Sequence, residues 1–563
     1  MGLLIDALIN LLRLLRNARR ALRRPPDFVW IPVSGALPEF EPSRRGLLRR
    51  RLDPRALAPS LQSIRSRLER ILAEGRVGGV ILRVENLDAG WAALEELRDE
   101  LHRFRSKGKK VAAYLVDPDT RSYYLASAAD EVYASPLSTL NLVGLRARVN
   151  FLKDALGSLG LETEVLAVSP YKSAADAISR SSFSRESREQ VERILDARFD
   201  EIVTAVFSGR DIPPEEVRTL IDHAPYPATM ATEKKLLDGA LYEDELPGRL
   251  AGGEKPVKLV EWGGASKILR LPYWRRARKI VGLVSIEGAI QRGRSRKLPV
   301  PLPLLGREQA GSDSVVAALR VAEKSRRVAA VLLHVDSPGG DALASDLIWR
   351  EVGRIRARKP VVVLMGNAAA SGGYYVSAAA SHIIARRGTL TGSIGVLAIR
   401  PVALGLYEKL GINPVTLERG ARAGLLDPSR RPNPDELQVI EGQIGRIYAE
   451  FKDRVARGRG MELPDLEGIA GGRVWTGAEA LDLGLVDETG GFREALTKAR
   501  ELGGIEWDVQ GVLAKVNPPK SGRPSPGEPA QGVVDAIGET WLALTELRAG
   551  GVRALAPYEI SED

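Results

Sequence analysis

The sequence contains two copies of one pattern. Five segments of the first half recur in the second half in the same order, at spacings of 253, 251, 251, 251 and 245 residues. The pairs are VWIPVSGAL (29–37) with VGLVSIEGAI (281–290), VGGVILRVENL (77–87) with VAAVLLHVDSP (328–338), SYYLASAADEVYASP (122–136) with GYYVSAAASHIIARR (373–387), NLVG (141–144) with GSIG (392–395), and ATEKKLLDGALYE (231–243) with TGAEALDLGLVDE (476–488). A repeat of this length indicates a duplicated folding unit.

Each copy alternates short apolar runs with longer helical patterns. In the second copy we expect strands at 280–286, 328–335, 360–365 and 382–386, and helices around 313–325, 341–358, 373–380 and 434–458. Such alternation is typical of parallel, crossover-connected α/β domains. We therefore predict two homologous α/β domains, preceded by a helix, joined by a linker and followed by a tail. The predicted bounds are 1–27 for the helix, 28–250 and 278–500 for the domains, 251–277 for the linker and 501–563 for the tail, with a Pro/Gly/Ser-rich stretch at 516–532 and a short helix at 533–550.

Composition excludes several kinds of site. The chain of 563 residues contains no cysteine, which rules out disulfides, thiolate metal sites and a cysteine nucleophile. Its four histidines (His102, His223, His334 and His382) lack the HxxxH and HExxH spacings of zinc sites. The net charge of +10 suits an anionic membrane surface, nucleic acid or a general basic bias, and no nucleic-acid-binding signature is present. We therefore expect no metal site and no nucleic-acid partner.

The N-terminal segment 1–27 predicts an amphipathic helix that Pro25 and Pro26 end. Its polar stripe is formed by Asp6, Asn10, Arg13, Asn17, Arg20 and Arg24. The apolar run 3–15 is short and interrupted, whereas a spanning helix needs about 20 apolar residues. The arginines follow the apolar run instead of preceding it, unlike those of a cleaved signal peptide. Two alternatives stay open: a helix in the membrane interface with its arginines on anionic headgroups, or a helix packed on the protein's own body or on a sister subunit.

Two glycine turns in the second copy predict the position of a site for acyl transfer. DSPGGD (336–341) and AAASGGYY (368–375) each follow a predicted strand, and sites of parallel α/β sheets gather at such strand ends. Ser371 is a candidate nucleophile. The backbone amides of Gly339 or Gly340, together with that of Gly372, could hold the oxyanion of an acyl-transfer reaction.

The serine needs a base, and histidine is a poor candidate for it. The stretch around His382 has no carboxylate to orient the ring, and His334 lies within a predicted strand. The first copy has Thr120 where the second has Ser371, but it holds Lys172 in SPYKSAAD (169–176), where the second copy has Arg422. A buried, neutral lysine can accept a proton, whereas arginine stays protonated. We therefore predict that Lys172 is the general base for Ser371.

The motifs DSPGG, AAASGGYYVSAAASHIIARRGTLTGSIGV, SPYKSAAD and GRVWTGAEALDLGLVDETGG together resemble the signal peptide peptidase A family of Ser-Lys proteases, in its long, duplicated form. The resemblance covers roughly residues 28–500. It implies a fold similar to that of Clp protease and the crotonases, with Ser371 as nucleophile, Lys172 as general base, and Gly339, Gly340 and Gly372 around the oxyanion. It also implies hydrophobic peptide substrates such as remnant signal peptides, no metal or nucleotide cofactor, and a homo-oligomer, by resemblance a tetramer.

The resemblance also bears on attachment to the membrane. The resemblance implies association with the bacterial cytoplasmic membrane, on a side that the sequence does not assign. The long form usually carries an N-terminal transmembrane anchor, whereas the apolar run of this chain is short. Two other functions stay open: a crotonase-like acyl-CoA enzyme, which shares the glycine turns but needs no serine nucleophile, and a non-catalytic membrane scaffold.

Overall fold

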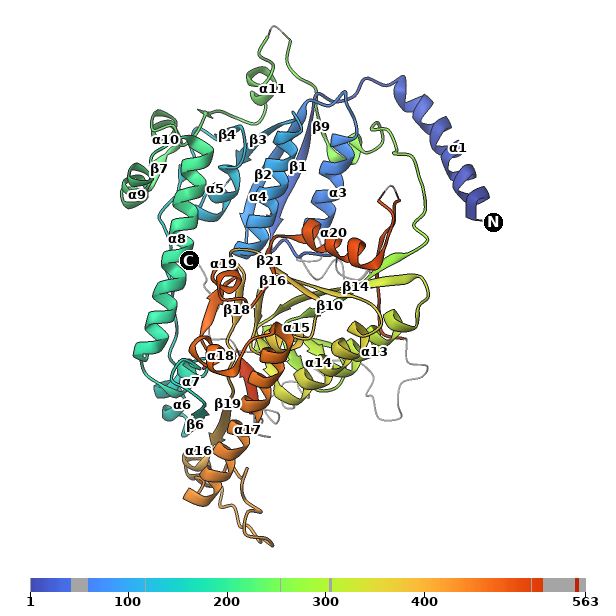
Figure 1. Ribbon diagram of the computed structural model, residues 1–563. Coiled ribbons are helices and arrows are strands. Elements are labelled where there is room, and N and C mark those ends of the chain that lie inside the picture. The colour runs from blue at the N-terminus through green and yellow to red at the C-terminus, as the bar shows by residue number, and fades with distance from the viewer. Residues whose placement is uncertain are drawn as a thin grey trace. The chain divides into compact units, whose positions relative to one another are not determined.

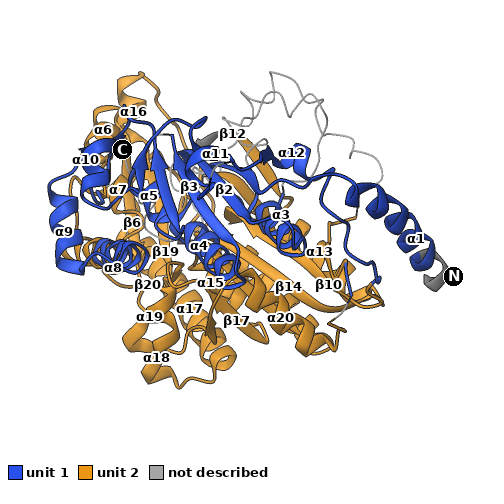
Figure 2. Cartoon of the chain, turned by 90° about the horizontal axis from the view of Figure 1, so that it is seen from above, with its two compact units in different colours: residues 1–146, 195–276, 508–510 blue, residues 147–194, 277–507, 511–563 orange. Residues whose placement is uncertain are grey.

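The protein has two compact units, each built on its own parallel sheet (Figure 2). The computed structural model describes residues 2–41, 59–116, 118–253, 255–302, 306–507, 509–519 and 552–555. Unit 1 comprises 1–146, 195–276 and 508–510, and unit 2 comprises 147–194, 277–507 and 511–563. The predicted helix at 533–550 and most of the predicted linker at 516–532 lie outside the described residues.

Unit 1 contains a six-stranded parallel sheet in the order β8-β4-β3-β2-β1-β9. The strands are β1 (Phe28–Gly35), β2 (Gly79–Leu87), β3 (Lys110–Leu115), β4 (Glu131–Ala134), β8 (Gly239–Ala240) and β9 (Leu259–Glu261). Helices α3 (Leu61–Leu72), α4 (Trp91–Ser106) and α5 (Thr120–Ala126) accompany the sheet (Figure 1). Apolar side chains of α4 recur at three- and four-residue steps and are fully buried, so this face of the helix packs into the core. They are Leu94, Leu97, Leu101 and Phe104.

Unit 2 repeats this strand order. Its parallel strands run β21-β17-β16-β14-β10-β22, and β18 and β20 continue the sheet beyond the carboxyl end of β16. The strands are β10 (Ile280–Glu287), β14 (Val328–Ser337), β16 (Val361–Ala370), β17 (His382–Ala385), β18 (Leu390–Gly392), β20 (Val474–Thr476), β21 (Glu488–Thr489) and β22 (Leu513–Lys515). The helices include α13 (Ser312–Lys324), α14 (Ala342–Arg356), α15 (Gly372–Ser377) and α17 (Pro434–Arg459). The same strand order in both units confirms the predicted duplicated α/β fold.

Side chains repeat along with the strands. The hydroxyl of Tyr123 on α5 donates to the Leu236 carbonyl at 2.7 Å, and that of Tyr374 on α15 donates to the Leu485 carbonyl at 2.8 Å. Both tyrosines are fully buried, so each hydroxyl needs an internal acceptor. The alignment of Tyr123 with Tyr374 in the sequence is therefore matched by equivalent positions in the fold.

A second, seven-stranded sheet belongs to unit 2 alone and has the order β12-β13-β11-β15-β23-β19-β6. Its strands are β6 (Glu162–Ala167), β11 (Ala289–Gln291), β12 (Arg296–Leu302), β13 (Gly306–Gly311), β15 (Gly339–Asp341), β19 (Leu397–Val402) and β23 (Val552–Leu555). Strand β6 comes from the first half of the sequence and pairs antiparallel with β19, from Leu397 opposite Ala167 to Val402 opposite Glu162. Residues 147–194 therefore fold with the second half, although the predicted first domain, 28–250, included them.

Helix α1 (Gly2–Ala21) contacts the segment 269–274 through its polar stripe. The Asn10 side chain donates to the Trp274 carbonyl and accepts from the Trp274 amide, both at 2.7 Å. The Asn17 side chain makes the same two bonds to Leu271, at 2.9 and 2.8 Å. Arg13 donates to the Pro272 carbonyl at 2.6 Å, and Arg20 donates to the Leu269 carbonyl. This part of the stripe faces the protein's own backbone, which agrees for Arg13 and Arg20 with the second alternative, a helix packed on the protein's own body.

Candidate functional site

Ser371 stands in a sharp turn between β16 and α15. Its φ of 54° and ψ of −114° are unusual for a residue with a side chain, and such a conformation costs on the order of 1–3 kcal/mol. Its amide donates to the Gly392 carbonyl at 2.8 Å, and its carbonyl accepts from the Tyr375 amide at 2.8 Å, so the turn is held on both sides. A Cβ on Gly372 would lie 2.5 Å from the Ser345 hydroxyl oxygen. The turn therefore requires the glycine that follows the serine.

Lys172 lies against this serine. It follows β6, whose pairing with β19 carries the loop to the carboxyl end of β16, and it belongs to the same compact unit as Ser371. The Nζ atom of Lys172 lies 2.7 Å from the Oγ atom of Ser371. Both side chains are buried, with relative exposures of 2% and 0%. The two residues that the sequence predicted as base and nucleophile are thus within direct hydrogen-bond distance, 199 positions apart in the chain.

Burial determines the charge of this lysine. It lowers the pKa of Lys172 well below its ordinary value of 10.5, because the ammonium form loses its hydration inside the protein. A neutral amine has a lone pair that can accept the hydroxyl proton of Ser371. The arrangement can therefore activate a serine without a histidine.

Ser393 is a third member of this cluster, and sequence reasoning missed it. The Nζ atom of Lys172 lies 2.9 Å from the Ser393 hydroxyl oxygen and 3.1 Å from the Ser393 carbonyl oxygen. Ser393 is fully buried and has a φ of 51°. These contacts fix the direction of the lysine amine toward Ser371. The motif TLTGSIG contains the residue, but nothing in the local pattern separates its serine from the two threonines.

The loop that carries Lys172 is anchored just before the lysine. The Ser169 hydroxyl donates to the Gly471 carbonyl at 2.5 Å and accepts from the Tyr171 amide at 3.1 Å. The buried Gln190 amide donates to the Tyr171 carbonyl at 3.1 Å and accepts from the Val474 amide at 2.9 Å. These bonds tie the residues just before Lys172 to the segment around β20, so the start of the lysine loop is fixed.

The predicted oxyanion glycines lie together. Gly339 and Gly340 have φ values of 107° and 154°, a region that favours glycine. A Cβ on Gly372 would lie 3.2 Å from both the Gly339 Cα and the Gly340 nitrogen, so the two turns are in contact. The Gly339 amide donates to the Ser337 hydroxyl at 3.2 Å. This bond engages the Gly339 amide, so we take the Gly340 amide forward as the proposed partner of the Gly372 amide.

The other predicted candidates lie elsewhere. His382 pairs with Val362 near the start of β16, whereas Ser371 follows the end of β16. The His382 ring contacts Glu488 at 3.1 Å instead. Arg422, the counterpart of Lys172, is half exposed and forms an ion pair with Asp435 at 2.9 Å. Neither residue is part of the Ser371 site.

Thr120, the counterpart of Ser371, is bonded within unit 1. Its hydroxyl oxygen lies 3.2 Å from the Gly144 carbonyl and 3.4 Å from the Asn141 carbonyl. It begins α5, and Asp119 caps this helix, so the strained turn of the second copy is absent at this position.

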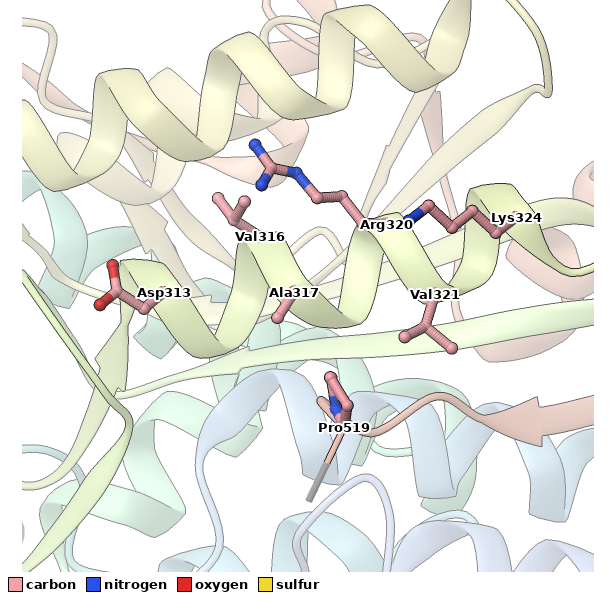
Figure 3. A pocket seen from close by; sticks show the side chains of 7 residues that line it. All are labelled: Asp313, Val316, Ala317, Arg320, Val321, Lys324 and Pro519. Atoms are coloured by element: carbon pink, nitrogen blue, oxygen red, sulfur yellow. The ribbon is translucent and has the colours of Figure 1, made fainter. Parts of the chain in front are cut away.

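Other potential sites are few in the part of the chain that the structure describes. A cavity of about 360 Å³ runs along α13 and is lined by the side chains of Asp313, Val316, Ala317, Arg320, Val321 and Lys324 with Pro519 (Figure 3). It includes no residue of the Ser371 cluster.

Among the described residues no group of three or more His, Cys, Asp or Glu side chains is arranged to hold a metal ion. None of the described helices has an apolar run long enough to cross a bilayer.

Comparison with known proteins gives matches over most of the chain. The model of peptidase family S49 matches residues 103–256 and 354–506. The chloroplastic serine protease SPPA of Arabidopsis thaliana is 33% identical over 472 residues, 83% of this chain and 69% of that protein. Protease 4 of Haemophilus influenzae is 31% identical over 448 residues, 76% of this chain and 70% of that protein. Among solved structures, a mutant of ClpP1 from Listeria monocytogenes matches with a TM-score of 0.25 and 16% identity, over 38% of this chain and 94% of that one.

Proposed function

Because the chain belongs to peptidase family S49 and has the long, duplicated form of signal peptide peptidase A, we propose that this serine peptidase cuts peptides with a Ser371–Lys172 dyad. The observation that carries the proposal is the 2.7 Å distance between Lys172 Nζ and Ser371 Oγ inside one buried cluster. The lowered pKa of Lys172 supports it, since an uncharged lysine is needed for this role.

The reaction follows from the positions of these groups. Neutral Lys172 takes the hydroxyl proton as Ser371 Oγ attacks the peptide carbonyl carbon, and the amides of Gly340 and Gly372 donate to the developing oxyanion. The lysine then gives its proton to the leaving amine as the peptide C–N bond breaks, which leaves an acyl ester on Ser371. Water, deprotonated by the same lysine, hydrolyses this ester and restores the serine. Ser393 keeps the amine pointed at Ser371 throughout.

The substrates we propose are extended hydrophobic peptides, such as remnant signal peptides. A cavity of about 160 Å³ borders β19 and β6, and apolar side chains form most of its wall. They are Leu166, Ala398, Ile399, Leu425, Leu426, Leu437 and Ile440. Such a wall favours apolar side chains of a peptide bound alongside β19.

We further propose that the enzyme works at the membrane surface, as a homo-oligomer. The polar stripe of α1 contacts the protein, whereas the leucines on the rest of the helix are exposed. They are Leu8, Leu11, Leu12, Leu14 and Leu15, with exposures from 48% to 67%, and Leu22 directly after the helix is 89% exposed. Exposed Arg16, Arg19 and Arg23 stand among them and suit anionic headgroups. This orientation supports a helix that enters the membrane interface with its leucines.

The dyad is tested by replacing each of its members in the full chain. Ser371→Ala and Lys172→Ala should each lower the hydrolysis of a hydrophobic fluorogenic peptide by about 10⁴-fold or more. Lys172→Arg is the matched control for charge, and it should be as inactive as Lys172→Ala because arginine does not give up its proton. Wild-type activity should rise with pH through the lowered pKa of Lys172, since only the neutral amine accepts a proton.

Three outcomes would oppose the proposal. Full activity of Lys172→Ala would eliminate the lysine as base. A crotonase-like acyl-CoA enzyme predicts that a fluorophosphonate probe leaves Ser371 unlabelled while acyl-CoA is turned over. A non-catalytic scaffold predicts neither labelling nor peptide hydrolysis.

A further inference from the structure

Ser337 carries a buried hydroxyl that the proposed reaction does not use. It is the last residue of β14, it is fully buried, and Pro338 alone separates it from the first oxyanion glycine. Its hydroxyl oxygen accepts from the Gly339 amide at 3.2 Å and lies 3.5 Å from the Gly339 carbonyl oxygen. A serine hydroxyl that bonds to the backbone two positions further on stabilises the turn between them. The Ser337 side chain therefore holds Gly339 at both of its backbone groups.

This contact acts on the peptide unit that contains a proposed oxyanion donor. The Gly339 carbonyl and the Gly340 amide belong to one planar unit, so the orientation of the first determines where the second points. The φ values of 107° and 154° on its two sides are accessible because neither glycine has a side chain, and the same freedom allows the unit to rotate. Gly340 pairs with Ile290 of β11, and Ser337 adds a side-chain bond at the Gly339 end of the unit.

Ser337 also packs against the turn that carries the other donor. A Cβ on Gly373 would lie 2.7 Å from the Ser337 carbonyl oxygen, and a Cβ on Gly372 would lie 3.2 Å from the Gly340 nitrogen. The residue whose hydroxyl bonds the first glycine turn thus touches the second turn through its backbone. Ser337 is therefore in a position to set the Gly340 amide relative to the Gly372 amide.

The first copy of the repeat differs at this point. Asn86 aligns with Ser337, and Asp88 and Ala89 align with the two glycines. Asn86 has a φ of 47°, whereas Ser337 lies in a strand. The hydroxyl is thus present in the copy that has the glycine turn and Ser371, and it is missing from the copy that has neither. Because both copies share the parallel sheet, this difference favours a role at the site over a role in the fold.

We propose that Ser337 is a positioning residue of this peptidase, whose hydroxyl orients the Gly339–Gly340 peptide unit so that the Gly340 amide points at the oxyanion. This inference rests on the proposed function of the Ser371 site. An oxyanion donor acts on the transition state, because the substrate oxygen gains its negative charge there. Loss of the hydroxyl should therefore lower kcat and leave KM close to its wild-type value.

The first test measures the hydrolysis of a hydrophobic fluorogenic peptide by variants of the full chain. Ser337→Ala should lower kcat about 100-fold with KM changed less than twofold, since loss of one oxyanion donor costs about 100- to 1,000-fold in kcat. Ser337→Cys fills the same space with a thiol, which is a weak hydrogen-bonding group, so it should lose kcat as well. Ser381→Ala is the control for the type of bond, because the Ser381 hydroxyl accepts from the Val361 amide at 3.1 Å at the opposite end of β16. It should behave like the wild type.

The second test uses a peptide aldehyde, which imitates the tetrahedral intermediate. Ser371 Oγ adds to the aldehyde carbon, the hydroxyl proton passes to Lys172, and the aldehyde oxygen becomes the oxyanion. The inhibition constant of the aldehyde should rise about 100-fold in Ser337→Ala, in step with the fall in kcat. The inhibition constant of the corresponding peptide alcohol, which forms no adduct, should stay unchanged.

The outcomes separate this inference from the dyad. Equal kcat and equal aldehyde affinity in the wild type and Ser337→Ala would overturn the inference and leave the dyad intact. Weaker binding of substrate and alcohol at unchanged kcat would also overturn it, because Ser337 would then shape the binding surface instead of the oxyanion site. A wild-type protein that neither hydrolyses the peptide nor binds the aldehyde more tightly than the alcohol would overturn the proposed function, and the inference with it.

Discussion

Gly472 determines whether Lys172 can reach Ser371. Its φ is 91°, and a Cβ at this position would lie 2.7 Å from both Cα and Cβ of Lys172 and 2.9 Å from its Cδ. The lysine stem therefore passes directly over a glycine, and a methyl group there would push it away. A displacement of about 1 Å in a catalytic group can cost about 100-fold in rate. We expect Gly472→Ala to lower kcat by about this factor, measured by peptide hydrolysis.

Gly468 provides a control for this change. It lies in α18 (Leu463–Ile469), only four positions away, and a Cβ there would meet nothing within 4 Å. Gly468→Ala should keep full activity and gain slightly in stability, because alanine favours a helix more than glycine does. Equal activity of the two alanine variants would show that the lysine tolerates the displacement and would contradict the argument from Gly472.

At the scale of elements, α1 contacts the rest of unit 1 through its polar groups and leaves its leucines exposed. Leu11 and Leu15 are 55% and 60% exposed and lie one turn apart, so replacing both by glutamine should not disturb the fold. We expect Leu11→Gln/Leu15→Gln to reduce co-sedimentation with vesicles of anionic phospholipid at least tenfold, since less apolar area enters the interface. Thermal unfolding should be unchanged.

Leu137 offers a matched control for the leucine pair. It is 92% exposed on a loop of the same unit, and Leu137→Gln should leave vesicle binding as it is in the wild type. If the α1 variant sediments with vesicles as well as the wild type does, these leucines do not hold the protein at the membrane. Loss of binding in both variants would mean that exposed leucines in general, not α1, are responsible.

The elements also show what the sequence could and could not predict. The apolar runs predicted β10, β14 and β17 within two residues, because such runs report local burial. Strand β16 extends five residues beyond its predicted end, and the strands of the second sheet were not predicted. The repeat did not predict that residues 147–194 fold with the second half, since this depends on the long-range pairing of β6 with β19. The stripe on α1 was recognised from its spacing, but spacing alone does not say which face of a helix meets the protein. Ser393 was missed because its role depends on a φ of 51° and on a lysine 221 positions away.

At the scale of the whole molecule, the two similar units differ at the positions of the proposed dyad. Unit 2 contains Ser371, Lys172 and Ser393, although Lys172 comes from the first half of the sequence. In unit 1 the position of the nucleophile is taken by Thr120, whose hydroxyl bonds to backbone carbonyls. The position of the second lysine is taken by Arg422, which pairs with Asp435 at the surface. The two halves of the sequence thus differ in a complementary way at the two positions of the proposed dyad.

This asymmetry predicts one reactive serine per chain. Saturating treatment with a fluorophosphonate should add a single probe mass to the intact protein, and peptide mapping should place it on Ser371, because this hydroxyl lies 2.7 Å from the amine of a buried lysine whose pKa is lowered. Thr120→Ser in a Ser371→Ala chain should stay unlabelled, since restoring a serine in α5 supplies neither the strained turn nor an adjacent base. Two probes per chain, or labelling of the Thr120→Ser variant, would show that the first unit retains a working site and that the duplication produced two active sites instead of one.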